Sequence, residues 1–383
     1  MTANPTPRDY NKASVLDVLL SRAPMTRNEL IELTGLSKAT VSRAVEELRA
    51  DGCVVDSGVD EVTGRGRRST YLDVPGTLGH VAGISFGLQT TCVLIADLRG
   101  REVRHVIVPT VDHHEVRSAA EWLVALMEEA SESAEGPLRQ VVVAVPGRVR
   151  NGVEIFGPAE SVKVFAGSGL QRTLADLVNA PVLVDSDANA SLLEILTDDA
   201  TLRNAALFSL SSILSFASCT DQELLRGRTA AFGDIGVLFS GVGNEPLDGL
   251  LSTKGLLRVA RERGLVVERI EDLWLEPHDE VPRAEVLDAF TTAVVTAVSA
   301  VAVTLDPESV FCVGRLRPLV DEVLPEVRRR LEKNLPTVPE VKAVPQVLGL
   351  SVARGAMHAC LGIVRDRLRD GVLEARRQGS RGA

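Results

Sequence analysis

Polar and cationic side chains follow one face of a short segment near the N-terminus, in a pattern typical of proteins that bind DNA. In residues 38–49, Val41, Val45 and Leu48 recur at spacings of four and three, which predicts a helix with one buried face. Ser37 lies at the expected N-cap. Together, the N-cap and the polar face of the helix carry groups that could contact bases and phosphates in the major groove: Ser37, Lys38, Thr40, Ser42 and Arg43.

The segment just before this helix predicts its partner in a helix-turn-helix. Residues 25–33 have the apolar spacing of a second short helix. Gly35 lies between the two helices, where the backbone must reverse its direction. The order and spacing therefore indicate a helix-turn-helix over residues 25–48.

A loop rich in glycine and arginine follows, between two segments with strand character. Residues 52–55 and 70–74 predict the strands, and the loop contains three arginines: Arg65, Arg67 and Arg68. Arginines between glycines suit a loop that enters a narrow minor groove or holds phosphates, as the wing of a winged helix does. The alternative is a basic surface loop, but its position directly after a helix-turn-helix favours the wing.

Composition indicates a globular protein with more than one domain. Its 383 residues suffice for two or three domains, and 45% of them are hydrophobic. The net charge of −10 argues against a protein that coats nucleic acid without selectivity. The acidic excess lies mainly outside residues 1–74, which contain 10 Lys and Arg against 11 Asp and Glu.

Cysteine usage and hydropathy predict a cytoplasmic protein that does not enter a membrane. The five cysteines are far apart and form no C-x-C or C-x-x-C pair, which fits buried thiols in a reducing compartment. The N-terminus lacks the apolar core of a signal peptide. The most apolar segment, residues 289–305, is shorter than the ~20 residues of a membrane span and predicts a buried core helix.

After a hinge at residues 75–77, the periodicity changes from helical to strand-like. Three strands are followed by helix, strand, helix, strand and helix, as in the ribonuclease-H-like half of an actin-type fold: residues 80–85, 90–97, 102–109, 115–133, 139–145, 169–178, 181–184 and 187–196. A second such half would begin at about residue 205. We therefore predict a winged helix-turn-helix domain over 1–75 and a second domain over 76–383, divided into a first subdomain (76–200), a second subdomain (201–350) and a C-terminal helix with its tail (351–383).

Four motifs in the second part resemble those of the ROK family of repressors and sugar kinases, specifically of its transcriptional regulators. They are Val145-Pro146-Gly147, the PVLVDSDANA stretch at residues 181–190, Leu305-Asp306-Pro307-Glu308 and Arg354-Gly355-Ala356. The resemblance covers nearly the whole chain. It implies an α/β protein in which an all-α winged-helix domain precedes an actin-like ROK domain of two ribonuclease-H-like subdomains.

The chain departs from the family pattern at both loops that hold ATP phosphates in the kinases. Where the resemblance implies a D-x-G-G-T loop, the chain has Ser85-Phe86-Gly87-Leu88-Gln89. Where it implies a second glycine-rich loop, residues 205–226 contain no glycine. Because a phosphate cradle needs backbone N–H groups that side chains do not obstruct, we expect neither ATP binding in the family's manner nor catalytic residues.

The zinc ligands of the family are missing as well. The histidine of the zinc motif corresponds to Val237, and residues 237–252 contain neither cysteine nor histidine. Because a structural zinc ion typically needs four ligands, we expect a protein that folds without metal or other cofactor. We also expect the apolar side chains of Val237, Leu238 and Phe239 to be buried and to anchor this loop in place of the metal.

Part of the family's sugar site is retained. Asp187 corresponds to the catalytic base of the kinases, Ser186 replaces a hydroxyl-binding Asn, and Asp234 replaces a Glu, while Asp248 is a candidate for another Glu. The resemblance thus implies a ligand site of Ser186, Asp187, Asp234 and Asp248. The alternative for Asp187 is a carboxylate that only stabilises the start of a helix. Two other polar segments predict solvated surface loops: His113-His114 and residues 221–226.

These observations predict a sequence-specific DNA-binding transcriptional regulator that acts as a repressor. Its ROK-like domain would serve for dimerisation and for sensing a sugar or sugar derivative. Its partners would be double-stranded operator DNA, a second copy or several copies of the chain, and a sugar-type effector. One alternative is an ATP-dependent sugar kinase with an appended DNA-binding domain, against which both phosphate loops argue. Another is a scaffold for oligomerisation that binds no ligand.

Overall fold

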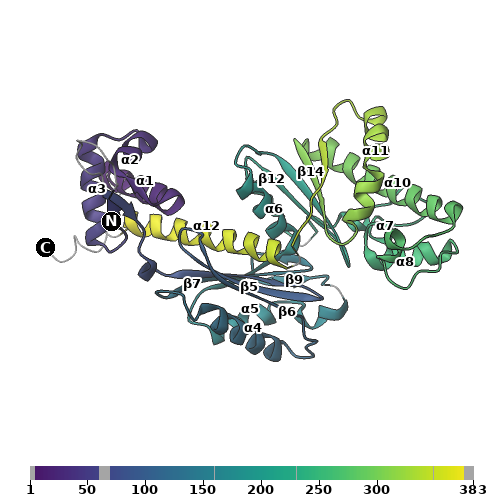
Figure 1. The fold of residues 1–383 in the computed structure, drawn as a ribbon, viewed down its shortest axis with the longest axis horizontal. Coiled ribbons are helices and arrows are strands. Elements are labelled where there is room, and N and C mark those ends of the chain that lie inside the picture. The colour runs from purple at the N-terminus through teal and green to yellow at the C-terminus, as the bar shows by residue number, and fades with distance from the viewer. Residues whose placement is uncertain (1–4, 60–69, 159, 230, 348, 375–383) are drawn as a thin grey trace.

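The computed structural model describes residues 5–59, 70–158, 160–229, 231–347 and 349–374. Figure 1 shows an N-terminal helical part, a first lobe built on one sheet and a second lobe built on another. The predicted wing arginines Arg65, Arg67 and Arg68, and the predicted tail at residues 376–383, lie outside the described residues.

Three helices and a small sheet of order β1-β3-β2 form the N-terminal part. Helix α2 begins with a capping box between Thr26 and Glu29 and ends at Gly35, which has a left-handed φ of 66°. Ser37 accepts a hydrogen bond from the amide of Thr40, which confirms the predicted N-cap of α3. The elements are α1 (Pro7–Arg22), β1 (Met25–Thr26), α2 (Arg27–Thr34), α3 (Lys38–Ala50), β2 (Val55–Val59) and β3 (Thr70–Asp73).

Two predictions for this part are wrong in detail. Met25 lies in β1, where it pairs with Leu72 of β3, and not in a helix. The first strand of the predicted wing begins at Val55 rather than at residue 52. The reason is that the amide of Cys53 donates to the carbonyl of Leu48 at 2.9 Å and closes the end of α3, so strand pairing starts only beyond this turn.

The first lobe is a five-stranded mixed sheet of order β10-β7-β4-β5-β6. β4, β5 and β6 are antiparallel neighbours, whereas β7 and β10 run parallel to β4, as the ribonuclease-H-like pattern predicts. Helices α4 and α5 cover one face, and α12 lies along the other with α6 beside it (Figure 1). The bounds are β4 (His80–Phe86), β5 (Thr90–Asp97), β6 (Glu102–Pro109), α4 (Val116–Ser131), β7 (Leu138–Val145), α5 (Gly169–Leu177), β10 (Val182–Ser186), α6 (Asp187–Asp198) and α12 (Leu350–Glu374), with the short hairpin β8 (Arg148–Arg150) and β9 (Glu154–Phe156) and the 3-10 turns η1 (Gly76–Leu78) and η2 (Glu160–Phe165).

The second lobe repeats a five-stranded sheet, of order β13-β12-β11-β14-β15, and packs its helices around the largest apolar core of the chain. β11 and β12 form an antiparallel pair, and β14 and β15 continue the sheet in parallel to β11. The bounds are β11 (Ala205–Leu210), β12 (Leu214–Thr220), β13 (Glu223–Leu224), η3 (Ile235–Val237), α7 (Asp248–Leu251), α8 (Thr253–Glu262), α9 (Asp272–Leu275), α10 (Glu280–Leu305), β14 (Ser309–Val313), α11 (Arg317–Asn334) and β15 (Glu340–Ala343).

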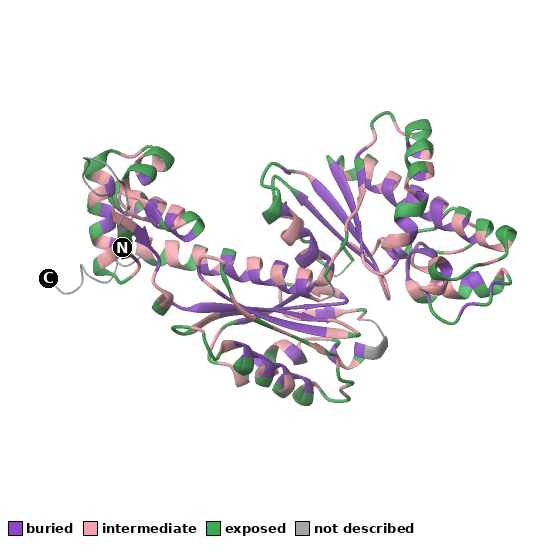
Figure 2. Ribbon diagram, viewed as in Figure 1, coloured by how far each residue is buried: buried purple, intermediate pink, exposed green. Residues whose placement is uncertain are grey.

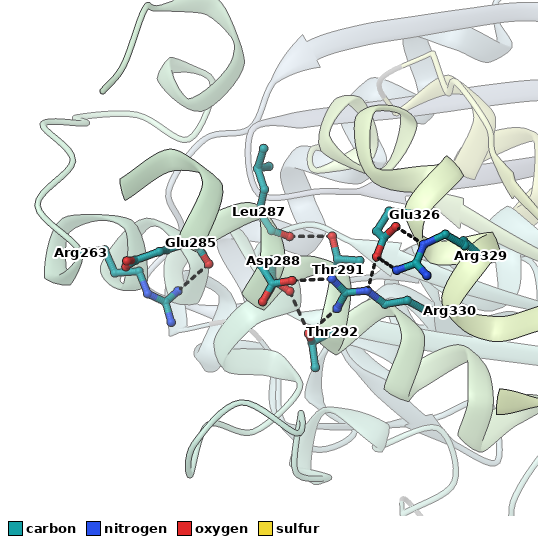
Figure 3. Close-up of polar contacts among 9 residues, drawn as sticks. All are labelled: Arg263, Glu285, Leu287, Asp288, Thr291, Thr292, Glu326, Arg329 and Arg330. Atoms are coloured by element: carbon teal, nitrogen blue, oxygen red, sulfur yellow. Dashed lines mark hydrogen bonds and ion pairs between the residues drawn. The ribbon is translucent and has the colours of Figure 1, made fainter. Parts of the chain in front are cut away.

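Helix α10 is a core helix, as its apolar sequence predicts, but it begins at Glu280 rather than at residue 289. Among the described helices it alone is long and apolar enough to match a membrane span, and 61% of its apolar window is buried inside the protein. Its polar side faces α11. There the guanidinium of Arg330 contacts Asp288 at 2.5 Å and Glu326 at 2.6 Å, and donates to Thr292 at 3.1 Å (Figure 3). This network orients the two helices while their apolar sides pack inward.

Buried residues concentrate in the strands of both lobes and on the inner sides of the helices (Figure 2). One apolar cluster runs without interruption from the N-terminal part into the first lobe. It includes Leu16 of α1, Val45 of α3, Leu94 of β5 and Leu361 of α12, of which the first three are fully buried. The N-terminal part therefore shares a hydrophobic core with the first lobe.

Candidate functional site

Helix α3 separates a buried face from a polar one. Val41, Val45 and Leu48 are fully buried, which confirms the predicted inner face. On the outer side, Ser37, Lys38 and Arg43 are exposed, whereas Thr40 and Ser42 are half-buried. The Ser37 hydroxyl also contacts the hydroxyl of Thr40 at 2.9 Å. The predicted DNA-contacting residues of α3 thus lie at one end of the helix, on the side that is turned away from the core.

Charge pairing distinguishes two cations of α3 from their neighbours. Arg49 contacts Glu46 at 2.8 Å and Asp56 at 2.6 Å, and the other paired cations of this part are Arg8 with Glu47, Lys12 with Asp51 and Arg27 with Glu46. By contrast, Lys38 and Arg43 form no ion pair with any residue that the structure describes. Their charges therefore remain available to an anionic partner such as DNA.

Two cavities lie between the lobes, and the predicted ligand residues divide between them. A cavity of about 450 Å³ has Ser186, Asp234 and Asp248 in its wall. A second cavity of about 400 Å³ is lined by residues 85–90, by the start of α11 and by Asp187. The structure thus brings together three of the four predicted ligand residues in the first cavity, which is called the sugar-side cavity after that prediction. Asp187 lies in the second, called the nucleotide-side cavity because residues 85–89 correspond to a phosphate loop of the kinases.

Two ion pairs join the lobes at the sugar-side cavity. Arg148 of β8 contacts Asp234 of the second lobe at 2.6 Å, and Arg226 of the second lobe contacts Asp185 of β10 at 2.6 Å. Each lobe thus supplies one cation and one anion. Sequence reasoning missed both arginines. Residues 221–226 lie at the surface as predicted, and Arg226 is exposed, but its guanidinium also reaches back to the buried carboxylate of Asp185.

Backbone amides hold the other two predicted ligand residues of the sugar-side cavity, Asp248 and Ser186. One carboxylate oxygen of Asp248 accepts a hydrogen bond from the amide of Leu214 at 2.7 Å, and burial raises the pKa of this carboxyl group. The Ser186 hydroxyl caps α6 by accepting from the amide of Asn189 at 3.1 Å. Hydroxyl, carboxylate and guanidinium groups therefore surround one cavity, a combination that suits a ligand with several hydroxyl groups.

Asp187 occupies the first turn of α6, where its carboxylate accepts a hydrogen bond from the amide of Ala188 at 2.8 Å. Burial raises the pKa of Asp187 to about 6. This geometry fits both interpretations of the residue, because a helix-start carboxylate and a ligand-facing acid would occupy the same place.

The nucleotide-side cavity carries side chains where phosphate binding needs bare backbone. Leu88 lines it on one side, and Ser211 and Ser212 line it on the other. Its two arginines are already engaged, Arg315 with Glu271 and Arg317 with Asp321. The described wall keeps the glycines Gly87, Gly314 and Gly349, but Leu88, Ser211 and Ser212 place side chains beside them and both arginines are paired, which is a poorer setting for phosphate groups than a glycine-rich loop.

The predicted packing is wrong for residues 237–239, in the loop that corresponds to the family's zinc motif and is called here the former zinc loop. Val237, Leu238 and Phe239 are 68%, 44% and 69% exposed, so they do not anchor the loop by burial. Backbone hydrogen bonds hold it instead. The amide of Leu247 donates to Leu238 at 2.7 Å, and the amide of Ser240 donates to Glu245 at 2.9 Å. No group of three His, Cys, Asp or Glu side chains that could hold a metal ion occurs within the described residues.

The prediction of a solvated loop holds for only one of the two adjacent histidines. His114 is exposed, whereas His113 is half-buried in an aromatic cluster. Its ring centroid lies 5.2 Å from that of Trp122 and 6.4 Å from that of Phe86. Burial lowers the pKa of His113, so this ring favours its neutral form and serves packing.

Known proteins match both parts of the chain. The sequence profile of the ROK family matches residues 81–360, and that of the MarR family matches residues 6–62. The chain is 24% identical over 299 residues to the xylose repressor of Caldicellulosiruptor bescii, covering 74% of this chain and 73% of that repressor. It is 24% identical over 238 residues to the xylose repressor of Bacillus subtilis, covering 60% of each.

Solved structures share the fold over three quarters of the chain or more. A ROK family transcriptional regulator, described as a homologue of the E. coli MLC protein, superposes with a TM-score of 0.72 at 17% identity, over 96% of this chain and 99% of that one. A ROK hexokinase from Thermus thermophilus superposes with a TM-score of 0.62 at 20% identity, over 75% of this chain and 99% of the hexokinase. The regulator thus extends over a larger share of the chain than the hexokinase does.

Proposed function

The chain belongs to the ROK family, and on that premise we propose that it is a DNA-binding transcriptional repressor whose helix α3 contacts the bases of its operator. The observation that carries the proposal is a pair of exposed cations on α3, Lys38 and Arg43, which form no ion pair with any described residue and lie in a MarR-type domain that precedes a ROK domain. The three wing arginines would add phosphate or minor-groove contacts. Such a protein acts in the cytoplasm.

A homodimer is the simplest assembly for this function. DNA readers of this type commonly pair by two-fold symmetry, so that each copy contacts one half of an inverted repeat. We therefore expect selection from random DNA with the full-length protein to enrich an inverted repeat whose half-sites lie about one or two helical turns apart. Sedimentation of the complex should give two chains for each duplex. A pool without an enriched motif would contradict the proposal.

The sugar-side cavity supports a sensing role for the ROK domain. Its volume of about 450 Å³ and its hydroxyl, carboxylate and guanidinium groups suit a sugar or sugar derivative. Two relatives are named xylose repressors, which makes a pentose the first effector to test. A neutral sugar could bridge Arg148 and Asp234 through its hydroxyl groups, since one side chain donates and the other accepts.

The rival functions make different predictions for the purified protein. We expect xylose or another sugar to raise the melting temperature, and we expect the Asp234→Asn variant to lose this response because it removes the charged acceptor. We expect no sugar phosphate to form when ATP is added, because Leu88 and the glycine-free segment 205–226 replace the family's phosphate loops. Sugar-dependent ATP turnover that Asp187→Asn abolishes would establish the kinase instead. Absence of any sugar response, with DNA binding intact, would favour the oligomerisation scaffold.

A further inference from the structure

Helix α12 connects the interlobe region to the DNA-binding part. Its start lies at the nucleotide-side cavity, where Gly349 and Val352 belong to the wall. From there it extends 25 residues along the sheet of the first lobe to α1 (Figure 1). At ~1.5 Å per residue, such a helix spans ~37 Å. A single rigid element therefore touches both the cavity and the part of the chain that would hold DNA.

Two glycines bring α12 into backbone contact with its neighbours. A Cβ atom on Gly355 of α12 would lie well inside 3.0 Å of the carbonyl oxygen of Ala190 in α6, an approach that real Cβ atoms essentially never show. A Cβ atom on Gly83 of β4 would likewise overlap the backbone of α12 at Ala353 and Met357. Helix α12 is thus seated directly on β4 and α6. At these contacts no side chain separates the backbones, so a displacement of α6 toward α12 would press directly on the backbone of α12.

The partner helix α6 begins at the candidate ligand residues. Ser186 is its N-cap, Asp187 is its first residue and Asn189 lines the sugar-side cavity. The next residue in the chain, Ala190, makes the close contact with Gly355. Between the same helices, Arg354 of α12 faces Glu194 of α6 at 3.8 Å. The ligand end of α6 and its contact with α12 therefore lie within about one helical turn of each other.

The far half of α12 holds the DNA-binding part in place. Arg365 donates a hydrogen bond to the carbonyl of Leu20 at 2.9 Å, in the last turn of α1, where helical carbonyls lack partners within their own helix. Next to this contact, Leu361 and Val364 of α12 belong to the same buried apolar cluster as Leu16 of α1. The position of α1, and with it that of α3, therefore depends on where α12 lies.

We propose that Gly355 and Arg365 are positioning residues for DNA binding. Through them, α12 sets the position of α3 according to where the N-terminal end of α6 lies beside the two interlobe cavities. This inference rests on the proposed function, because it needs a dimer that binds two half-sites. From Gly355 to Arg365 the helix extends ~15 Å, so a displacement at α6 reaches α1 through one rigid element. The two copies of α3 in a dimer fit one half-site spacing only while both α12 helices are seated.

The test compares two substitutions in the same helix of the full-length protein. Gly355→Ala places a methyl group against the backbone of α6, whereas Gly362→Ala is the matched control because nothing lies within 4 Å of its added Cβ atom. We expect Gly355→Ala to weaken binding to the selected inverted repeat at least tenfold, with affinity for a single half-site unchanged. Gly362→Ala should leave both affinities unchanged.

Each other result has a distinct meaning. Equal behaviour of the two variants on both DNAs would overturn the inference, and so would an equal loss on the full site and the half-site. If Gly355→Ala does not fold, Arg365→Met decides by the same criterion, because it removes the hydrogen bond to Leu20 and keeps an apolar stem. A wild-type protein that binds neither DNA would instead refute the proposed function.

Discussion

Replacing Arg43 with Ala should weaken binding to the operator by ~1–3 kcal/mol and reduce the discrimination between operator and unrelated DNA. The reason is that Arg43 is exposed on the outer side of α3 and has no ion pair within the described part of the chain, so its guanidinium can make a base contact. Fluorescence anisotropy with labelled operator and scrambled duplexes measures both affinities. The effect should be largest on the operator.

Arg49→Ala is the matched control for Arg43→Ala. It removes the same charge from the same helix, but the guanidinium of Arg49 is held by Glu46 and Asp56. We expect its effect on operator affinity to be below ~0.5 kcal/mol. Equal losses for the two variants would mean that α3 contributes only net charge.

Joint replacement of the wing residues Arg65, Arg67 and Arg68 should instead weaken binding evenly across sequences and flatten its salt dependence.

The contribution of Asp187 to the free energy of unfolding should fall as the pH rises from about 4 to about 7. Burial raises the pKa of this carboxyl group to about 6 in the folded protein, from an ordinary value of 3.8. Its contribution to stability is therefore fully present below the unfolded pKa and is lost as the pH rises through the folded pKa. Asp187→Asn should abolish this pH-dependent decrease in the free energy of unfolding, which amounts to at most about 3 kcal/mol. Urea unfolding of both proteins at several pH values measures it.

The opposite end of α6 offers a control with the reverse sign. Hydrogen bonds from the hydroxyl and the amide of Thr201 lower the pKa of Asp199, so its contribution is present at neutral pH and is lost as the pH falls. At neutral pH, Asp199→Asn should therefore lower the free energy of unfolding, whereas Asp187→Asn should raise it. An Asp187→Asn protein that keeps the wild-type pH dependence would show that burial does not perturb this carboxyl group.

Local patterns in the sequence determined the elements that depend on nearest neighbours. In the first lobe β4 and β5 are short, continuously buried runs, whereas β6 alternates between half-buried and exposed positions, and all three end within a residue or two of their predicted bounds. Ser37 and Gly35 were readable as a cap and a turn because each acts on its own backbone. The missing phosphate and zinc motifs were equally visible, since such motifs are contiguous.

Only the tertiary structure decided which side chains meet across the cleft. Arg148 and Asp234 are 86 residues apart, and Arg226 and Asp185 are 41 apart, so no local period relates them. Burial was equally hidden for the former zinc loop. The apolar sequence at Phe239 predicted packing, but a side chain is buried only where another element covers it, and among the described residues none does there. The close contact between α12 and α6 could not be predicted from the sequence either. Nothing in the sequence distinguishes Gly355 from the other 30 glycines until the fold places Ala190 against it.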